Sequence, residues 1–410
     1  MRVPAAVIVV TVAWLATGCG SDAGVKPVAT TSCSRILYEG EGKPDVIVVS
    51  DLPLRGDMGQ HAIRPQVDAI EFVLRERGFR AGEHRVGYQS CNDGIRSGGY
   101  DTVLCRRNAH AYVAAKDVLG VIGPWNSDCA LEQIPIISRK GAGPLAMISP
   151  ANTYAVLTRR AALYPDGVRS YVRVVAHEQA EGIAAAHWAK RLGARRIVVL
   201  RQTKPDVSSY ARGLVDPFTK AAGGLGLDVR QFLWPDQRSY KRLAATVAAA
   251  HPDAVFLAGL PEGNGKALIQ DLRAALGSKT PMIAPEDFAA PPIARALGRA
   301  GEGMYATQPG IPADRLPPSG RRFVRTFGRT APEAAQATEV LLDAIARSDG
   351  TRMSVVRELF ASKVRNGILG TFSFDRFGDI VPAPVAIYRI HNRRVVTAGV
   401  ERAPLEALDR

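Results

Sequence analysis

The sequence reads Val118-Leu119-Gly120-Val121-Ile122-Gly123-Pro124-Trp125-Asn126-Ser127 where a short apolar run gives way to a polar loop. The same arrangement recurs at Leu145–Thr153 and at Met282–Asp287. Apolar runs of this length, bounded by turn residues, are typical of buried strands. Ligands of open α/β sheets bind beyond the carboxyl ends of the strands. The polar side chains of these three loops are therefore predicted to hold a small solute.

Strand-like runs alternate with amphipathic helical stretches along most of the chain. One series extends from Val46–Val49 to Leu145–Ile148, and a second extends from Ile197–Leu200 to Met282–Ala284. Alternation of this kind builds parallel sheets with helices on both faces. Because a chain of 410 residues is long for a single core, the two series predict two doubly wound α/β lobes.

The amino-terminal segment predicts export. Cys19 follows about fourteen largely apolar residues, Ala5–Gly18, and one basic residue, Arg2. This pattern is typical of a bacterial export signal that ends in small residues and a cysteine. The apolar run is too short to span a membrane as a helix. We expect residues 1–18 to be a lipoprotein signal peptide and Cys19 to be acylated, which would anchor the protein by lipid at the cell surface or in the periplasm. An ordinary signal peptide, in which the cysteine has no such role, is the alternative. Residues 19–43, which begin with a Gly-, Ser- and Thr-rich stretch, are expected to carry the acylated cysteine and a flexible tether.

Four cysteines remain after Cys19, namely Cys33, Cys91, Cys105 and Cys129. An even number in an oxidising compartment favours disulfides over metal ligation. Four cysteines allow three pairings, and the sequence does not choose among them. Because Cys91 and Cys105 bracket a Gly- and Ser-rich loop, we favour a bridge between these two, which leaves Cys33 with Cys129 by elimination. One or two free buried thiols are the alternative.

Charge and motifs argue against several classes of function. The chain has 53 Lys and Arg against 39 Asp and Glu. The basic residues are scattered among acids and form no tract interleaved with aromatics, so nucleic acid is not an expected partner. No later run is long and apolar enough to cross a membrane, and the body of the chain is expected to be soluble.

The motifs of common enzymes are missing from the sequence. No Gly-x-Ser-x-Gly elbow occurs, and the seven histidines show no metal-ligand spacing. The stretch Leu260–Ala267 lacks both the leading Gly and the final Ser or Thr of a phosphate loop. We therefore expect no enzymatic activity, no cofactor and no metal.

Several further motifs carry a resemblance to a known family. In chain order they are Ser50–Leu54, Val121–Pro124 with Ser127, Ile148–Thr153, Tyr171–Val174, Tyr210–Leu214 and Pro252–Gly259. Together they resemble a type I periplasmic binding protein of the branched-chain amino acid (Leu/Ile/Val) group, which serves ABC importers. The resemblance covers about Pro44 to Val396. It implies a Venus-flytrap fold in which a three-strand hinge, with crossings near residues 171–173, 304–307 and 371–374, joins two lobes. Lobe 1 would comprise residues 44–171 with 306–372, and lobe 2 residues 172–305 with 373–404.

The resemblance also implies the residues of an amino-acid site. Ser127 matches a serine whose hydroxyl and backbone N–H hold the carboxylate of the ligand, and the start of a helix favours an anion there. Ala151 matches a position that offers its carbonyl oxygen, and Thr153 matches one that offers hydroxyl and backbone contacts. From the opposite lobe, Tyr210 matches an aromatic that covers the ligand. Glu286 matches the acid that pairs with the α-ammonium group.

Each residue also has an ordinary structural explanation. Ser127 can cap a helix, and Thr153 can belong to a turn. Tyr210 can be a partly buried packing residue. Glu286 can be a solvated loop acid, and its neighbour Asp287 can take the binding role instead.

Three departures from the family pattern bear on the ligand. Leu260 stands where a second site tyrosine of the amino-acid binders falls, and Ala176–Glu181 replaces an Asp-rich turn. The first ligand loop carries Arg55 and Asp57, which match no ligand atom. Trp125, close to Ser127, is expected either to line the cleft or to belong to the core. These departures leave the receptor class intact but do not fix an aliphatic ligand.

The sequence thus predicts an extracytoplasmic receptor. We expect a monomer that captures a small polar solute, an amino acid or a related zwitterion, by closure of its lobes. It would deliver the solute to an ABC permease in the membrane. The alternative is a ligand sensor that signals to a membrane partner without transport.

Overall fold

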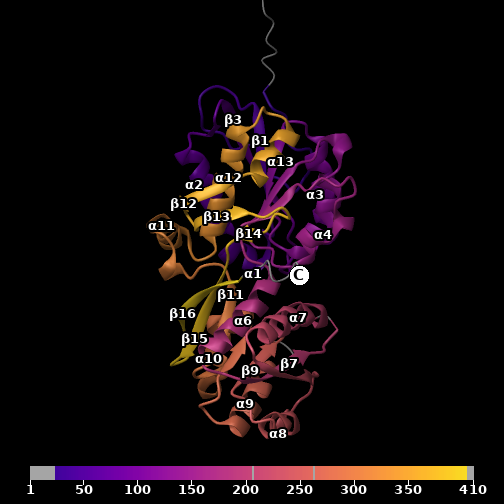
Figure 1. Cartoon of the computed structure of the whole chain (residues 1–410). Coiled ribbons are helices and arrows are strands. Elements are labelled where there is room, and N and C mark those ends of the chain that lie inside the picture. The colour runs from indigo at the N-terminus through magenta and orange to yellow at the C-terminus, as the bar shows by residue number, and fades with distance from the viewer. Residues whose placement is uncertain (1–23, 206, 262–263, 404–410) are drawn as a thin grey trace, which may run out of the picture.

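A computed structural model describes residues 24–205, 207–261 and 264–403, and it divides into two α/β lobes (Figure 1). The predicted signal peptide and the acylation site at Cys19 lie outside the described residues. Among the residues that are described, no helix combines the length and the apolar character needed to span a membrane.

The first sheet forms the upper lobe in Figure 1 and has the strand order β2-β3-β1-β4-β5-β6. All its strands are parallel except the short β2, which pairs antiparallel with β3. Within β1, Val48 packs with helices α2 and α12 on one face, and Val49 packs with α3 and α4 on the other. Alternate strand residues point to opposite faces, so a sheet covered on both faces needs a continuous apolar run. The elements are β1 (Val46–Leu52), β2 (Arg80–Ala81), β3 (His84–Asn92), β4 (Val118–Ile122), β5 (Ala146–Ser149), β6 (Tyr171–Arg173), α2 (Arg64–Glu76), α3 (Thr102–Ala114), α4 (Ser127–Ile137), α12 (Ala331–Arg347) and α13 (Arg352–Phe360).

The second sheet forms the lower lobe and has the order β16-β15-β11-β10-β9-β7-β8. Its strands from β7 to β11 are parallel, and β15 and β16 add an antiparallel edge. Within β7, Val198 packs with α8 and α9, and Val199 packs with α7 and the end of α6. The elements are β7 (Arg196–Gln202), β8 (Asp228–Trp234), β9 (Ala254–Ala258), β10 (Met282–Ala284), β11 (Tyr305–Pro309), β15 (Ala383–His391), β16 (Arg394–Ala403), α6 (Glu178–Arg191), α7 (Ser208–Gly224), α8 (Lys241–Ala249) and α9 (Gly265–Leu276).

A small antiparallel sheet and several short helices complete the fold. The small sheet contains β12 (Lys363–Gly367), β13 (Gly370–Phe374) and β14 (Ile380–Val381). The short helices are α1 (Gly56–Met58), α5 (Val156–Arg159), α10 (Pro291–Leu297), α11 (Pro318–Phe327), a π-turn at Gly59–Ile63, and 3-10 turns at Lys140–Ala142, Ala161–Leu163, Glu286–Ala289, Gly298–Gly301 and Ala313–Arg315. The predicted two-lobe α/β fold is confirmed, with mixed rather than purely parallel sheets.

The chain passes between the lobes after β6, after β11 and between β14 and β15. The third passage differs from the expected boundary at residues 372/373, because Phe374 and Ile380 still pack in the core of the first lobe. The small sheet thus extends the first lobe by several residues. The other lobe boundaries stay a prediction.

Residues 24–43, expected to belong to a flexible tether, instead pack beside β3. Val28 is buried, and its N–H donates to Oε1 of Gln89 at 2.8 Å. Leu37 and Tyr88 exchange backbone hydrogen bonds of 2.7 and 3.0 Å. Because β2 covers only two residues of β3, the rest of that strand presents free backbone groups, and this segment pairs with them. For residues 24–43 the tether prediction is wrong.

The disulfides join Cys33 to Cys91 and Cys105 to Cys129. The favoured pairing of Cys91 with Cys105 and of Cys33 with Cys129 is therefore wrong, although all four cysteines do form disulfides. Cys105 lies on α3 and Cys129 lies on the adjacent α4, whereas Cys91 lies on β3 opposite Cys33. Short separation in the sequence was misleading, because tertiary packing decides which sulfurs meet.

Candidate functional site

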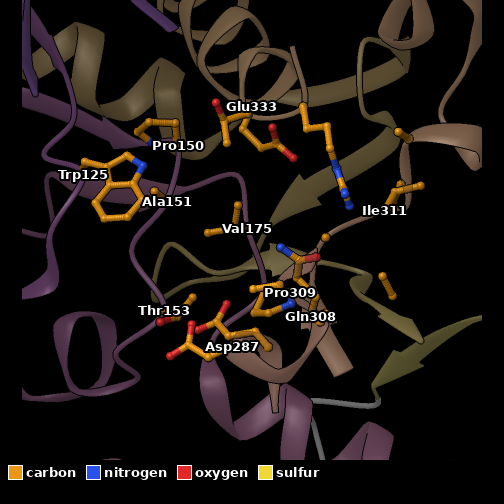
Figure 2. Close-up of a pocket in the computed structure, with 18 of the residues that line it drawn as sticks. Trp125, Pro150, Ala151, Thr153, Val175, Asp287, Gln308, Pro309, Ile311 and Glu333 are labelled. Carbon is orange, nitrogen blue, oxygen red and sulfur yellow. The ribbon is translucent and has the colours of Figure 1, made fainter. Parts of the chain in front are cut away.

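A cavity of about 580 Å³ is lined by loops from both lobes (Figure 2). The first lobe contributes the segments after β4 and β5, and the second lobe contributes the segment after β10 together with parts of β11 and β15. Five of the six residues predicted to bind the ligand line this cavity: Trp125, Ser127, Ala151, Thr153 and Glu286. The loop ends of strands that are far apart in the sequence thus form one site, as expected for open α/β sheets.

The loop after β4 places Ser127 at the first turn of α4. Asn126 is the N-cap, and its side chain makes no capping hydrogen bond. The hydroxyl of Ser127 accepts a hydrogen bond of 3.4 Å from the N–H of Tyr154, in the loop after β5. The first N–H groups of a helix have no partner within it, so this end of the cavity can receive an anion.

The two loops of the first lobe brace each other. Asn152 donates through Nδ2 to the carbonyl oxygen of Trp125 at 2.8 Å, and Ser149 accepts from the N–H of Asn152 at 3.0 Å. Gly123 has φ 131°, and a Cβ there would lie 2.5 Å from the carbonyl oxygen of Asp51. Only glycine allows the loop to pass so close to β1. These contacts hold the Ser127 loop rigid without help from a ligand.

The second lobe brings carboxylates to the site. Glu286 and Asp287 follow β10 and line the cavity, and Glu178 and Glu181 of α6 are buried behind them. Burial, helped by the charge of Asp287, raises the pKa of Glu286 to about 8. Burial likewise raises the pKa of Glu178 to about 7. Glu181 is fully buried, accepts from Oγ1 of Thr307 at 2.8 Å, and leaves its Oε2 without a partner among the described residues.

Tyr210 lies outside the cavity lining in this structure. It belongs to the first turns of α7, and its buried hydroxyl has no hydrogen-bond partner in the described part of the chain. Burial raises the pKa of Tyr210, and the charges of Glu181 and Glu286 raise it further. The tyrosine is therefore near the acidic side of the site but not in contact with the cavity.

The raised carboxyl pKa values predict a pH dependence of stability. Glu286 titrates near 4.5 when unconstrained and near 8 in the folded protein, so the folded state binds the proton more tightly. Stability therefore falls as pH rises from about 5 to about 8.5, and thermal unfolding in buffers of constant ionic strength should show this. The decline should be shallower in Glu286→Gln, whose amide does not titrate. An unchanged slope in that variant would show that Glu286 is not the group responsible.

Sequence reasoning missed the other end of the cavity. Glu333, Arg329, Tyr388 and Gln66 line it. Burial raises the pKa of Glu333 to about 7, and its Oε2 has no hydrogen-bond partner within the described residues. The guanidinium of Arg329 donates to the hydroxyl of Tyr388 over 3.4 Å. Pro332 marks a helix start, but nothing in the sequence links this helix to loops about two hundred residues earlier.

Comparison with known proteins identifies the class. A sequence profile of the periplasmic binding protein family matches residues 95–393, so the chain belongs to this family of receptors. No curated protein matches the chain at a significant level. The family has no enzymatic activity of its own, which agrees with the predicted absence of catalysis.

Solved structures share the fold at low sequence identity. A leucine binding protein from Thermotoga maritima is 23% identical, with TM-score 0.67 over 88% of this chain and 99% of the other. An ABC transporter substrate-binding protein from Desulfitobacterium hafniense in complex with Leu is 19% identical, with TM-score 0.69 over 86% and 99%. A solute binding protein from R. palustris in complex with benzoate is 18% identical, with TM-score 0.60 over 87% and 96%. These similarities support the two-lobe architecture.

Proposed function

We propose that this protein is an extracytoplasmic receptor that captures an amino acid or a related zwitterion and delivers it to an ABC importer. The observation that carries the proposal is the opposed chemistry of the cavity. Ser127 and Thr153 of the first lobe offer hydroxyl groups beside the start of α4, and Glu286 of the second lobe offers a carboxylate. A zwitterion needs donors for its carboxylate and an acceptor for its ammonium group.

Relatives of the same fold support this class of ligand. Two are a leucine binding protein and a complex with Leu, and a third binds benzoate, which has a carboxylate but no ammonium group. A carboxylate is common to these ligands. We assign it to the Ser127 end of the cavity in this protein, and we propose membership of the branched-chain amino acid group on the motifs of the sequence.

The arrangement implies a simple binding mechanism. The carboxylate of the ligand meets the N–H groups of the first turn of α4, and its ammonium group replaces the proton that burial favours on Glu286. Closure of the lobes brings Tyr210 toward the ligand and excludes water, which strengthens each polar contact. The lipid anchor at Cys19, the monomeric state and the permease partner are parts of the same proposal.

A ligand screen tests the function. We expect amino acids to raise the thermal midpoint of the purified protein, and Ser127→Ala with Thr153→Val to abolish this rise while nearly preserving the midpoint of the free protein. Binding is confirmed by calorimetry. The screen includes amides, short-chain acids and aromatic acids. A midpoint raised only by acids without an amino group would contradict the zwitterion, and a rise that persists in the double variant would place the carboxylate elsewhere.

A further inference from the structure

The cavity is larger and more polar than a site for a zwitterionic head group needs. Besides the Ser127 and Glu286 end, it extends to Glu333 in the first turn of α12 and to Arg329 and Tyr388. Figure 2 draws Thr153 and Asp287 toward one end and Glu333 toward the other, with Val175 between them. A ligand held at the head-group end therefore has its side chain directed along an apolar passage to a second polar region.

Glu333 is the residue in this region that most needs a partner. Its side chain is partly buried, and its Oε2 is inaccessible and accepts no hydrogen bond in the described residues. A buried acceptor without a donor is unfavourable, and native structures rarely leave one unsatisfied. Since Glu333 lines the cavity, a small rotation of its side chain would present the carboxyl to a donor carried by the ligand, which would remove this cost. Burial raises the pKa of Glu333 to about 7, and a donor beside the ionised carboxylate would lower this pKa again.

Arg329 supplies the complementary chemistry. It is exposed, lines the same cavity, and, among the described residues, donates to the hydroxyl of Tyr388 over a long 3.4 Å. A guanidinium has five N–H donors, so several remain for a ligand acceptor. The end of the cavity at Glu333 and Arg329 thus offers an acceptor, the carboxyl of Glu333, and donors of opposite charge, the N–H groups of Arg329. A carboxylate would pair with Arg329 but be repelled by Glu333, and an ammonium would pair with Glu333 but be repelled by Arg329. A neutral group with both a donor and an acceptor complements both residues.

We propose that Glu333 and Arg329 form a subsite for a carboxamide, so that the preferred solute is an amino acid whose side chain ends in an amide. The amide NH₂ donates to Glu333, and the amide carbonyl accepts from Arg329. The apolar passage at Val175 and Pro309 contacts the methylene groups between head and amide. This inference rests on the proposed amino-acid receptor function and specifies its ligand.

Calorimetry with a matched series of ligands tests the subsite. We expect glutamine to bind at least about tenfold more tightly than methionine, glutamate or lysine, because a site with buried polar groups discriminates against analogues that leave them unpaired. Glu333→Leu should reduce glutamine binding to the level of methionine and leave methionine binding unchanged. Glu83→Gln, at an exposed turn remote from the cavity, is the control and should behave as the wild type.

A second variant protects the test against a folding defect. Arg329→Met removes an exposed guanidinium, so the fold should persist, and it should weaken glutamine several-fold without affecting methionine. If amino acids bind but the wild type does not prefer glutamine, or if Arg329→Met keeps the preference, the subsite is overturned and the receptor function stands. If none of these amino acids binds, the proposed function and the subsite both fall.

Discussion

Replacing Glu286 with glutamine lowers the affinity for an amino acid by at least about tenfold, which corresponds to roughly 1.4 kcal/mol. Glutamine keeps the size of the side chain and one acceptor, but it loses the charge that pairs with an ammonium group. Hydrogen bonds to charged groups contribute about 1.5–3 kcal/mol, so the loss should reach this size. Calorimetry at pH ~8.5 measures it, because Glu286, with a pKa of about 8, is then largely ionised in the free protein.

Two variants make the interpretation of Glu286 specific. Asp287→Asn changes the adjacent cavity acid and should have the smaller effect. If Asp287→Asn weakens binding more than Glu286→Gln does, Asp287 takes the ammonium-binding role. The affinity for a ligand without an amino group, such as a short-chain acid, should not fall in Glu286→Gln. Equal losses for both kinds of ligand would indicate damage to the cavity instead of a lost ion pair.

Replacing Asp379 with alanine destabilises the fold by about 3–5 kcal/mol, because the buried cation Arg173 loses its carboxylate partner in the interior. Asp379 and Arg173 are both fully buried, and Nε of Arg173 donates to Asp379 at 2.8 Å. Arg159 pairs with the same carboxylate at 3.0 Å. Arg173 ends β6, at the first passage between the lobes, and Asp379 precedes β14, close to the third. The ion pair thus ties two of the connecting segments together.

Denaturant unfolding at neutral pH measures this loss. Although burial alone would raise the pKa of Asp379, Arg173, His177 and Arg159 together lower it to about 2. Its contribution to stability is present above the ordinary value of 3.8 and is lost as pH falls toward 2. The matched control is Asp375→Asn. Asp375 pairs with Arg159 at 3.1 Å, on the less buried side of the cluster. A loss for Asp379→Ala no larger than for Asp375→Asn would refute the importance of the buried pair.

The local pattern of the chain predicted much of the site. Ser127, Thr153 and Glu286 each follow an apolar strand directly, and the carboxyl ends of parallel strands meet at one edge of a sheet. The convergence of Ser127 and Thr153 follows from their strands being neighbours in one sheet. Glu286 follows a strand of the other sheet, and its place opposite them was implied by the resemblance to the receptor family. The role of Tyr210 depends on lobe closure, which a pattern along the chain does not describe. For this reason the sequence motif predicted Tyr210 at the ligand, whereas in this structure Tyr210 lies outside the cavity lining.

The acids behind the site were not predicted. Glu178 and Glu181 lie in a helix whose first turn is acidic, which is ordinary for an exposed helix start. Only the packing of α6 against α7, β11 and β15 buries them and raises their pKa values. Glu333 was missed for the same reason, because the helix that carries it reaches the cavity by way of a return passage between the lobes.

By itself the sequence determined the alternation of strands and helices, the two lobes and the loops that carry the binding groups, because periodicity and turn residues act over a few neighbouring positions. Tertiary structure alone decided which cysteines pair, that residues 24–43 add to the edge of β3, and that Arg329 and Glu333 join the cavity. These outcomes depend on contacts between segments far apart in the chain. Such contacts are fixed by how apolar faces pack and which buried polar groups find partners, and no local pattern records that.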